Sequence, residues 1–234
     1  MASSDEHLSR SQSNTNSSGP DSTGADSTGP SDRPTTPAEN FEQMYAEHRP
    51  PWDIGKPQPE FVKVADRIRG SVLDVGCGTG ENALFFAAQE CEVTGVDLLA
   101  APIAEANRKA AERKLQATFL QQDALELSKL NQQFDNVLDC GFFHILSDED
   151  RVRYTGELSQ VMALGATLYL QCFSDQEPAG EGPRRVSAEE LRATFQDGWQ
   201  VESIVECRFV TREDAEAHFS EGGPHALFAV IQRV

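Results

Sequence analysis

The stretch that decides the fold is VLDVGCGTGEN, residues 72–82. It has the pattern of a short apolar strand with a carboxylate, followed by a glycine-rich turn and the start of a helix. Side chains are absent at Gly76, Gly78 and Gly80, so a ligand can touch the backbone of this turn directly. Strand-turn-helix units of this kind bind nucleotides in several classes of α/β protein. The stretch therefore predicts a nucleotide site.

Strand and helix patterns alternate on both sides of this turn. We expect helices over residues 81–89, 101–114, 147–163 and 187–195, and strands over residues 71–75, 91–97, 117–123, 134–143, 165–173, 199–210 and 225–234. The early strands are apolar on both faces, which is typical of buried parallel strands. This order predicts an α/β fold with a doubly wound sheet and right-handed crossovers. The last two strands can form an antiparallel pair at one edge, although residues 211–224 are longer than a hairpin loop.

Capping residues support two of the expected helices. Ser147 is followed three residues later by Asp150, and Ser187 is followed by Glu190 at the same spacing. A serine hydroxyl at this position accepts a hydrogen bond from the backbone of the first helical turn. We therefore expect helices to begin after Ser147 and Ser187.

The amino-terminal segment differs in composition from the rest of the chain. Residues 1–37 contain few apolar side chains and many Ser, Thr, Asp, Gly and Pro residues. Such a segment buries too little apolar surface to offset the entropy of ordering it. It also lacks the apolar run of a secretory signal. We expect a disordered tail over 1–37 and a single domain over 38–234.

Charge and cysteine usage narrow the functional classes. The chain carries 38 Asp and Glu against 20 Lys and Arg, a net charge of -18, which disfavours nucleic acid or anionic membranes as partners. No apolar run approaches the roughly 20 residues needed to cross a bilayer. The five cysteines include no C-x-x-C pair, which argues against a zinc site or a disulfide framework. We expect no bound metal and a cytoplasmic location.

The residues around the glycine turn indicate the charge of the ligand. A dinucleotide site has a third glycine where this chain has Glu81. We expect the Glu81 carboxylate to repel a pyrophosphate there, at a cost on the order of 1 kcal/mol. Asp74 and Glu81 bracket the turn, so a cationic ligand with an adenosine end and no phosphates suits it better. S-adenosylmethionine carries a sulfonium and an ammonium and is such a molecule.

Carboxylates also stand at the ends of the next strands. Asp97 is placed to accept hydrogen bonds from both ribose hydroxyls, and Asp123 from an adenine amino group. Each aspartate alone is more often a turn former or helix cap, but the set around one glycine turn is more specific. The predicted cofactor-binding residues of this region are Asp74, Gly76, Cys77, Gly78, Gly80, Asp97, Leu98, Asp123, Ala124 and Asp139.

These motifs resemble those of the class I S-adenosylmethionine-dependent methyltransferases. VLDVGCGTGEN resembles the first motif of that family, and VTGVDL (93–98), QQDAL (121–125) and FDNVLDCGFFH (134–144) resemble the following ones. The resemblance implies a Rossmann-like seven-stranded sheet, mostly parallel with an antiparallel last strand. It also implies that S-adenosyl-L-methionine is converted to S-adenosyl-L-homocysteine.

The segment before the first strand adds a narrower resemblance. YAEHRPPWDIGKPQPEFV (45–62) is similar to the leader of a subgroup that methylates thiols, thiopurines, halides and heterocyclic toxins. The similarity implies that residues 38–69 form a lid over the cofactor, with Trp52, Asp53 and Gln58 as lid residues, Trp52 being placed at the cofactor. Trp52 could instead simply pack on the domain surface.

The acceptor side is less specific. His144 follows the fourth strand and is a candidate base for a hydroxyl or thiol acceptor, although it could instead position the substrate or cap the loop. Phe142 and Phe143 are expected as pocket walls or core. Arg184 and Arg185 lie in a loop that either meets an anionic substrate or is solvated. The N/D-P-P-Y/F signature of amino methylation of DNA or protein is missing.

We therefore expect a monomeric cytoplasmic enzyme that methylates a small apolar or aromatic acceptor at S, N, O or halide. One alternative is a catalytically silent domain that binds S-adenosylmethionine as a sensor or scaffold. The other is an NAD-dependent oxidoreductase on the same fold, against which Glu81 argues.

Overall fold

The computed structural model describes residues 37–47, 50–180, 182–213 and 219–234. All of them belong to one compact unit, Thr35–Val234. The tail predicted over residues 1–37 lies outside the described residues except for Pro37, at which the first helix begins. The domain boundary at residue 38 therefore stays a prediction.

The described elements follow the predicted alternation. The helices are α1 (Pro37–Glu47), α2 (Pro59–Lys63), α3 (Glu81–Ala87), α4 (Ala100–Arg113), α5 (Asp148–Val161) and α6 (Ala188–Thr194). The short 3₁₀ segments are η1 (Ala65–Arg67), η2 (Ala124–Leu130) and η3 (Phe143–Ile145). The strands are β1 (Ser71–Val75), β2 (Glu92–Asp97), β3 (Thr118–Gln121), β4 (Phe134–Cys140), β5 (Met162–Phe173), β6 (Trp199–Arg208) and β7 (His225–Arg233).

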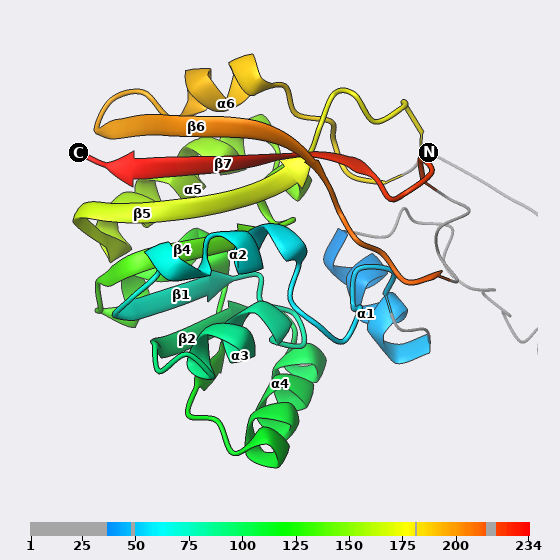
Figure 1. Cartoon of the computed structure of the whole chain (residues 1–234), viewed down its shortest axis with the longest axis vertical. Helices are drawn as coiled ribbons and strands as arrows, with labels where there is room; N and C mark the ends of the chain where they lie inside the picture. The colour runs from blue at the N-terminus through cyan, green and yellow to red at the C-terminus, as the bar shows by residue number, and fades with distance from the viewer. Residues whose placement is uncertain (1–36, 48–49, 181, 214–218) are drawn as a thin grey trace, which may run out of the picture. The chain divides into compact units, whose positions relative to one another are not determined.

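The strands form one seven-stranded sheet in the order β3-β2-β1-β4-β5-β7-β6. Strands β1 to β5 pair in parallel, whereas β7 is antiparallel to both β5 and β6 (Figure 1). This confirms the predicted fold class, the antiparallel last strand and the antiparallel pair at one edge. The order reverses at β1, and in such sheets the ligand crevice lies at this switch point.

The apolar core has two layers, one on each face of the sheet. Successive residues of β1 point to opposite faces, so Val72 packs with Phe86 of α3 while Leu73 belongs to the layer that contains Tyr154 and Leu158 of α5. In Figure 1, α2 and α3 lie on one face of the sheet and α5 lies on the other. Burial on both faces explains why the early strands are apolar throughout.

Both predicted helix caps are present. The hydroxyl of Ser147 accepts a hydrogen bond from the Asp150 amide at 3.1 Å, and Ser187 accepts one from Glu190 at the same distance. Helix α5 ends before the predicted residue 163, because strand β5 begins at Met162, which pairs with Phe134 of β4. Met162 and Ala163, which were predicted to be helical, therefore belong to strand β5.

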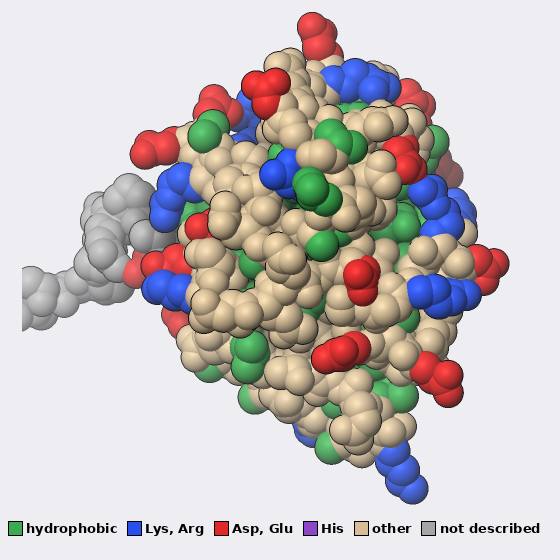
Figure 2. All heavy atoms as spheres, turned by 90° about the vertical axis from the view of Figure 1, so that its left-hand side faces the viewer, with side chains coloured by type: hydrophobic (Ala, Val, Ile, Leu, Met, Phe, Trp, Pro, Cys, Tyr) green, Lys and Arg blue, Asp and Glu red, His purple; other side chains and the backbone are tan. Residues whose placement is uncertain are grey.

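The two ends of the sheet differ. Helix α1 lies beside the carboxyl ends of the parallel strands (Figure 1). Figure 2 shows the opposite end, where acidic and basic side chains are interspersed without a large patch of either sign. Among the described helices, none has the length and apolarity to span a membrane.

Candidate functional site

The glycine loop connects β1 to α3 and needs its glycines for two reasons. Gly76, Gly78 and Gly80 have positive φ angles of 63°, 53° and 83°, which glycine adopts most readily. Neighbouring rings also approach the backbone closely. A Cβ on Gly80 would lie 2.9 Å from the Phe119 ring, and one on Gly76 would lie 3.2 Å from Phe142. The loop therefore exposes backbone without side chains at its three glycines, and the neighbouring rings pack against it.

Asp74 lies beneath this loop and is almost completely buried. Its Oδ2 accepts a hydrogen bond from the Ala83 amide in the first turn of α3 at 3.0 Å. Burial, with smaller contributions from Asp139 and Asp97, raises the pKa of Asp74 from 3.8 to about 8. A cation bound nearby would favour the charged form of this carboxyl.

Asp97 stands at the end of β2, as predicted, and faces the loop. Its Oδ2 accepts the Gly78 amide at 3.0 Å and its Oδ1 accepts the Leu99 amide at 2.9 Å. Burial raises its pKa above the ordinary value, although the two amides act in the opposite direction. The next residue, Leu98, is half exposed, at 50%. The structure thus brings Asp97 and the glycine loop together.

Asp123 follows β3 and caps η2, because its Oδ1 accepts the Leu125 amide at 2.8 Å. This is the helix-cap role that an aspartate at a strand end commonly has. Ala124 is buried in the apolar layer that contains Leu73. Both stand at the sheet edge that carries Asp97, since the ends of β2 and β3 pair at Asp97 and Gln121.

Asp139 is fully buried near the end of β4 and shapes the turn that follows. Its Oδ1 accepts the amides of Phe142 and Phe143 at 2.9 and 3.1 Å, and its Oδ2 accepts the Tyr154 hydroxyl at 2.9 Å. Burial raises the pKa of Asp139 to about 6 against these hydrogen bonds. Both oxygens thus bond to the protein, and the cofactor contact expected of Asp139 stays a prediction.

The expected repulsion between Glu81 and a phosphate is not supported, because the Glu81 carboxylate is paired with two cations. The Glu81 carboxylate accepts hydrogen bonds from Lys109 and Arg113 of α4, each at 2.8 Å. Although partial burial acts in the opposite direction, these two cations hold the pKa of Glu81 below its usual range. The carboxylate is therefore neutralised by its partners, and its charge alone does not exclude an anion.

The leader covers the glycine loop with a residue that sequence reasoning missed. The hydroxyl oxygen of Tyr45 on α1 lies 3.0 Å from the position of a Cβ on Gly78. Trp52 donates a hydrogen bond to this oxygen at 3.4 Å and packs edge-on against Phe41, with the ring centroids 5.5 Å apart. Trp52 remains 39% exposed. The sequence feature that could have identified Tyr45 is its position as the first residue of the leader motif.

Asp53 and Gln58 fix the leader in place. Asp53 accepts a hydrogen bond from the Thr79 hydroxyl of the glycine loop at 3.1 Å. The Gln58 side chain accepts the Val210 amide at 2.9 Å and donates to the Val210 carbonyl at 2.8 Å. Asp53 therefore attaches the leader to the loop, whereas Gln58 attaches it to the segment after β6.

His144 lies in η3 and is buried. The Phe173 amide donates a 2.9 Å hydrogen bond to its Nδ1. Burial, with Arg151 and Arg185 adding to it, lowers the pKa of His144 to about 3. A neutral imidazole whose basic nitrogen already accepts a proton donor is unsuited to the role of general base. The geometry favours the alternative in which His144 positions the substrate or caps the loop.

The other residues considered for the acceptor side divide between core and surface. Phe143 is fully buried in the core, whereas Phe142 packs on the glycine loop. Arg184 forms ion pairs with Asp148 and Glu190. Arg185 donates to the Pro178 carbonyl at 2.8 Å, and its guanidinium lies 5.6 Å from the centre of the Phe173 ring. Within the described ranges, no three His, Cys, Asp or Glu side chains are grouped to hold a metal ion.

The sequence matches known methyltransferases. The family model "Methyltransferase domain" matches residues 72–165. The chain is 34% identical over 187 residues to a 2-heptyl-1-hydroxyquinolin-4(1H)-one methyltransferase of Mycobacteroides abscessus, covering 78% of this chain and 80% of that protein. It is 30% identical over 180 residues to a thiopurine S-methyltransferase of Pseudomonas putida, covering 68% and 78%.

A solved structure gives the same result at the level of the fold. It concerns the conversion of a disulfide bond into a thioacetal group during echinomycin biosynthesis. The two structures superimpose with a TM-score of 0.75 at 32% identity, over 83% of this chain and 92% of the other. With the glycine loop, the Asp97 contact and the strand order, these matches show that the chain belongs to the class I S-adenosylmethionine-dependent methyltransferases, among those that act on small molecules.

Proposed function

We propose that this enzyme transfers the methyl group of S-adenosyl-L-methionine to an aromatic heterocycle, thiol or phenol-type acceptor. The observation that carries the proposal is the enclosure of the glycine loop by the leader, through Tyr45 over Gly78 and Asp53 on Thr79. A reactive methyl donor needs a site closed to water, whereas a silent sensor domain has less need of one. The quinolone and thiopurine methyltransferases among its relatives support the acceptor class.

The cofactor would lie across the carboxyl ends of β1 to β3. A carboxylate has about four lone-pair sites, so Asp97 can keep its two amide bonds and also accept the ribose hydroxyls. Leu98, Asp123 and Ala124 would border the adenine. The methionine part would follow the bare backbone of the loop above Asp74. The Tyr45 hydroxyl lies over Gly78 of this loop, and Trp52, which donates a hydrogen bond to it, would help Tyr45 to cover the cofactor.

The chain's own residues would act by binding the reactants, orienting them and excluding water from them. The sulfonium supplies an activated methyl carbon, and its in-line displacement by the acceptor yields S-adenosyl-L-homocysteine. Fixing the two reactants in line is worth several kcal/mol. The glycine loop, held by Asp97 and by the packing of Phe142 on Gly76, provides a rigid floor for this alignment.

We further propose that the acceptor is a small molecule and that neither nucleic acid nor membrane is a partner. The net charge of -18 supports this, because phosphate backbones and anionic lipids attract basic surfaces. We also propose that the enzyme is a monomer and acts in a reducing cytoplasm, and the five free cysteines support the reducing compartment.

Methyl transfer from labelled S-adenosylmethionine tests the proposal. The full chain is incubated with 2-heptyl-1-hydroxyquinolin-4(1H)-one, a thiopurine and thiophenol, and the products are separated. We expect label on at least one acceptor, with S-adenosyl-L-homocysteine released in equal amount. Tight cofactor binding without label on any acceptor would favour the sensor or scaffold alternative.

A further inference from the structure

His144 stands next to the glycine loop, but the cofactor contacts proposed above do not use it. Phe142, two residues earlier, packs on Gly76 of the loop. Asp139 holds the intervening turn by accepting the amides of Phe142 and Phe143. The imidazole is thus fixed at the carboxyl end of β4, at the edge of the sheet where an acceptor must meet the methyl group.

The hydrogen bond from Phe173 sets the tautomer of this imidazole. Because the Phe173 amide donates to Nδ1, the ring proton of the neutral form is on Nε2. In the part of the chain that the structure describes, no residue accepts a hydrogen bond from Nε2. Nε2 is not among the fully buried atoms of the described residues that lack a partner, so this N–H is accessible rather than enclosed. His144 therefore presents one fixed N–H donor.

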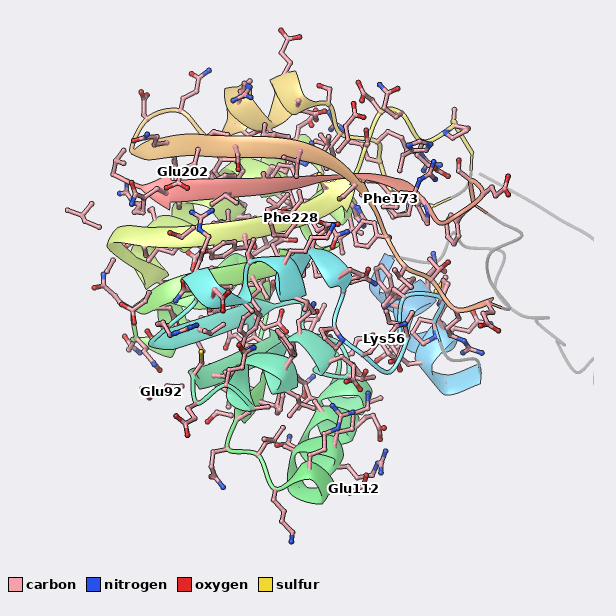
Figure 3. All side chains as sticks on the ribbon, in the orientation of Figure 1. Lys56, Glu92, Glu112, Phe173, Glu202 and Phe228 are labelled. Atoms are coloured by element: carbon pink, nitrogen blue, oxygen red, sulfur yellow. The ribbon has the colours of Figure 1, made fainter. Side chains whose placement is uncertain are left out.

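Bare backbone and aromatic rings lie beside His144. A Cβ on Gly141, whose φ is 83°, would lie 3.5 Å from Nε2 of His144 and 3.9 Å from the Phe209 ring. Phe173 packs against both Phe209 and Phe219, at centroid distances of 5.4 and 6.0 Å. Figure 3 shows Phe173 at the carboxyl end of β5, on the side of the molecule where α1 lies. These surfaces suit a planar aromatic molecule.

Positive and negative groups both lie near His144. Arg151 of α5 and Arg185 of the segment before α6 both act on it, whereas Asp139 of its own turn is engaged by backbone amides and Tyr154. Cys207 of β6 belongs to the same aromatic cluster as Phe173. The Nε2–H donor and the positive charge of Arg185 favour an anion over a neutral molecule at this position, whereas Arg151 is already paired with Glu190.

We propose that His144 binds the acceptor as a neutral hydrogen-bond donor through Nε2, and that the acceptor is an aromatic oxide or thiolate already deprotonated in solution. The inference rests on the proposed function and names the form of its substrate. The acceptor loses its proton to water before it binds. Its lone pair then forms the bond to the methyl carbon, while the electron pair of the carbon-sulfur bond stays on sulfur.

If the acceptor binds already deprotonated, the pKa of the acceptor sets the pH dependence of kcat/KM. We expect kcat/KM to rise with pH up to the pKa of each acceptor, so the midpoint moves along a series of para-substituted thiophenols and 1-hydroxyquinolones. His144→Phe should lower kcat/KM by about 10- to 100-fold, mainly through KM, because a hydrogen bond to a charged group is lost. His144→Gln restores an amide donor and should recover part of this loss. Neither variant should move the midpoint.

His225→Gln is the matched control, because His225 is the other described histidine and its side chain lies against Arg208 of β6. All variants are first titrated with S-adenosylhomocysteine, whose unchanged affinity shows that the fold and cofactor site are intact. A midpoint common to all acceptors that disappears in His144→Phe would overturn the proposal in favour of a base.

Failure of the inference can be separated from failure of the proposed function. If the wild-type chain binds cofactor but labels none of the aromatic acceptors, the proposed function fails and the inference falls with it. If the wild type labels them and His144→Phe matches it in kcat/KM, the inference alone is wrong. For a variant that does not fold, the midpoints of the wild-type enzyme across the acceptor series still decide the outcome.

Discussion

Asp97 at the end of β2 accepts the amide of Gly78 at 3.0 Å and so holds the glycine loop that follows β1. The two strands are adjacent and in register, with Val75 opposite Val96. One carboxylate therefore shapes the loop, and we propose that it also binds the ribose.

Replacing Asp97 should weaken the binding of the cofactor without unfolding the chain. We expect Asp97→Ala to reduce the affinity for S-adenosylhomocysteine by roughly 1 to 3 kcal/mol, the range for losing hydrogen bonds to a charged group. Calorimetric titration measures this. Asp135→Ala is the matched control, because Asp135 lies at the start of β4 and bonds to Ser71. Equal affinities for Asp97→Ala and the wild type would show that Asp97 does not bind the ribose.

Tyr45 provides a test of the lid. Tyr45→Ala removes the ring that lies over Gly78 and should raise the KM for S-adenosylmethionine by roughly tenfold, equivalent to about 1.4 kcal/mol. Tyr45→Phe keeps the ring and loses only the long hydrogen bond from Trp52, so its KM should stay within about twofold of the wild type. If Tyr45→Ala has wild-type kinetics, α1 does not cover the cofactor.

Gly80 should be intolerant of any side chain. Its φ is 83°, and an added Cβ would lie 2.9 Å from Phe119 and 3.0 Å from Ala106. We expect Gly80→Ala to lower the free energy of unfolding by about 1 to 3 kcal/mol, as overpacking and backbone strain do. Gly156→Ala in α5 is the control, because no atom lies within 4 Å of its added Cβ. Urea unfolding that ranks Gly80→Ala as the more stable variant would contradict this packing.

Asp74 should make the ligand-free protein less stable as pH rises. Its pKa is about 8 in the folded state and 3.8 ordinarily, so over this window the folded state keeps a proton that the unfolded state has released. Stability therefore falls as pH rises from about 4 to about 8. Asp74→Asn removes this contribution while still accepting the Ala83 amide. We expect its gain in unfolding free energy over the wild type to grow between pH 5.5 and 8, and a pH-independent difference would refute the assignment.

The strands and two helix caps could be predicted from the sequence, whereas the end of α5 and the presence of α1 could not. The positions of the strands along the chain followed from apolar runs, and the caps at Ser147 and Ser187 from local spacing, because both depend on neighbouring residues. The end of α5 was placed too late, since the pairing of Met162 with Phe134 depends on a partner far away in the chain. Helix α1 was not anticipated for a similar reason, because its contacts are with α4 and the glycine loop.

The site shows the same division. The place of Asp97 beside the glycine loop could be predicted, because the end of β2 fixes its position whichever side chains surround it. The neutralisation of Glu81 was missed, because Lys109 and Arg113 lie about one helix further along and reach it only in the folded state. The neutral state of His144 was likewise invisible, since it depends on the amide of Phe173 on a different strand.

The most direct test of the account is a calorimetric titration of the full chain with S-adenosylmethionine and, separately, with NAD. The bare loop between Asp74 and Asp97, closed by the leader, should bind one S-adenosylmethionine per chain and should bind it more tightly than NAD. Binding of NAD at equal or higher affinity would contradict the account and restore the oxidoreductase alternative.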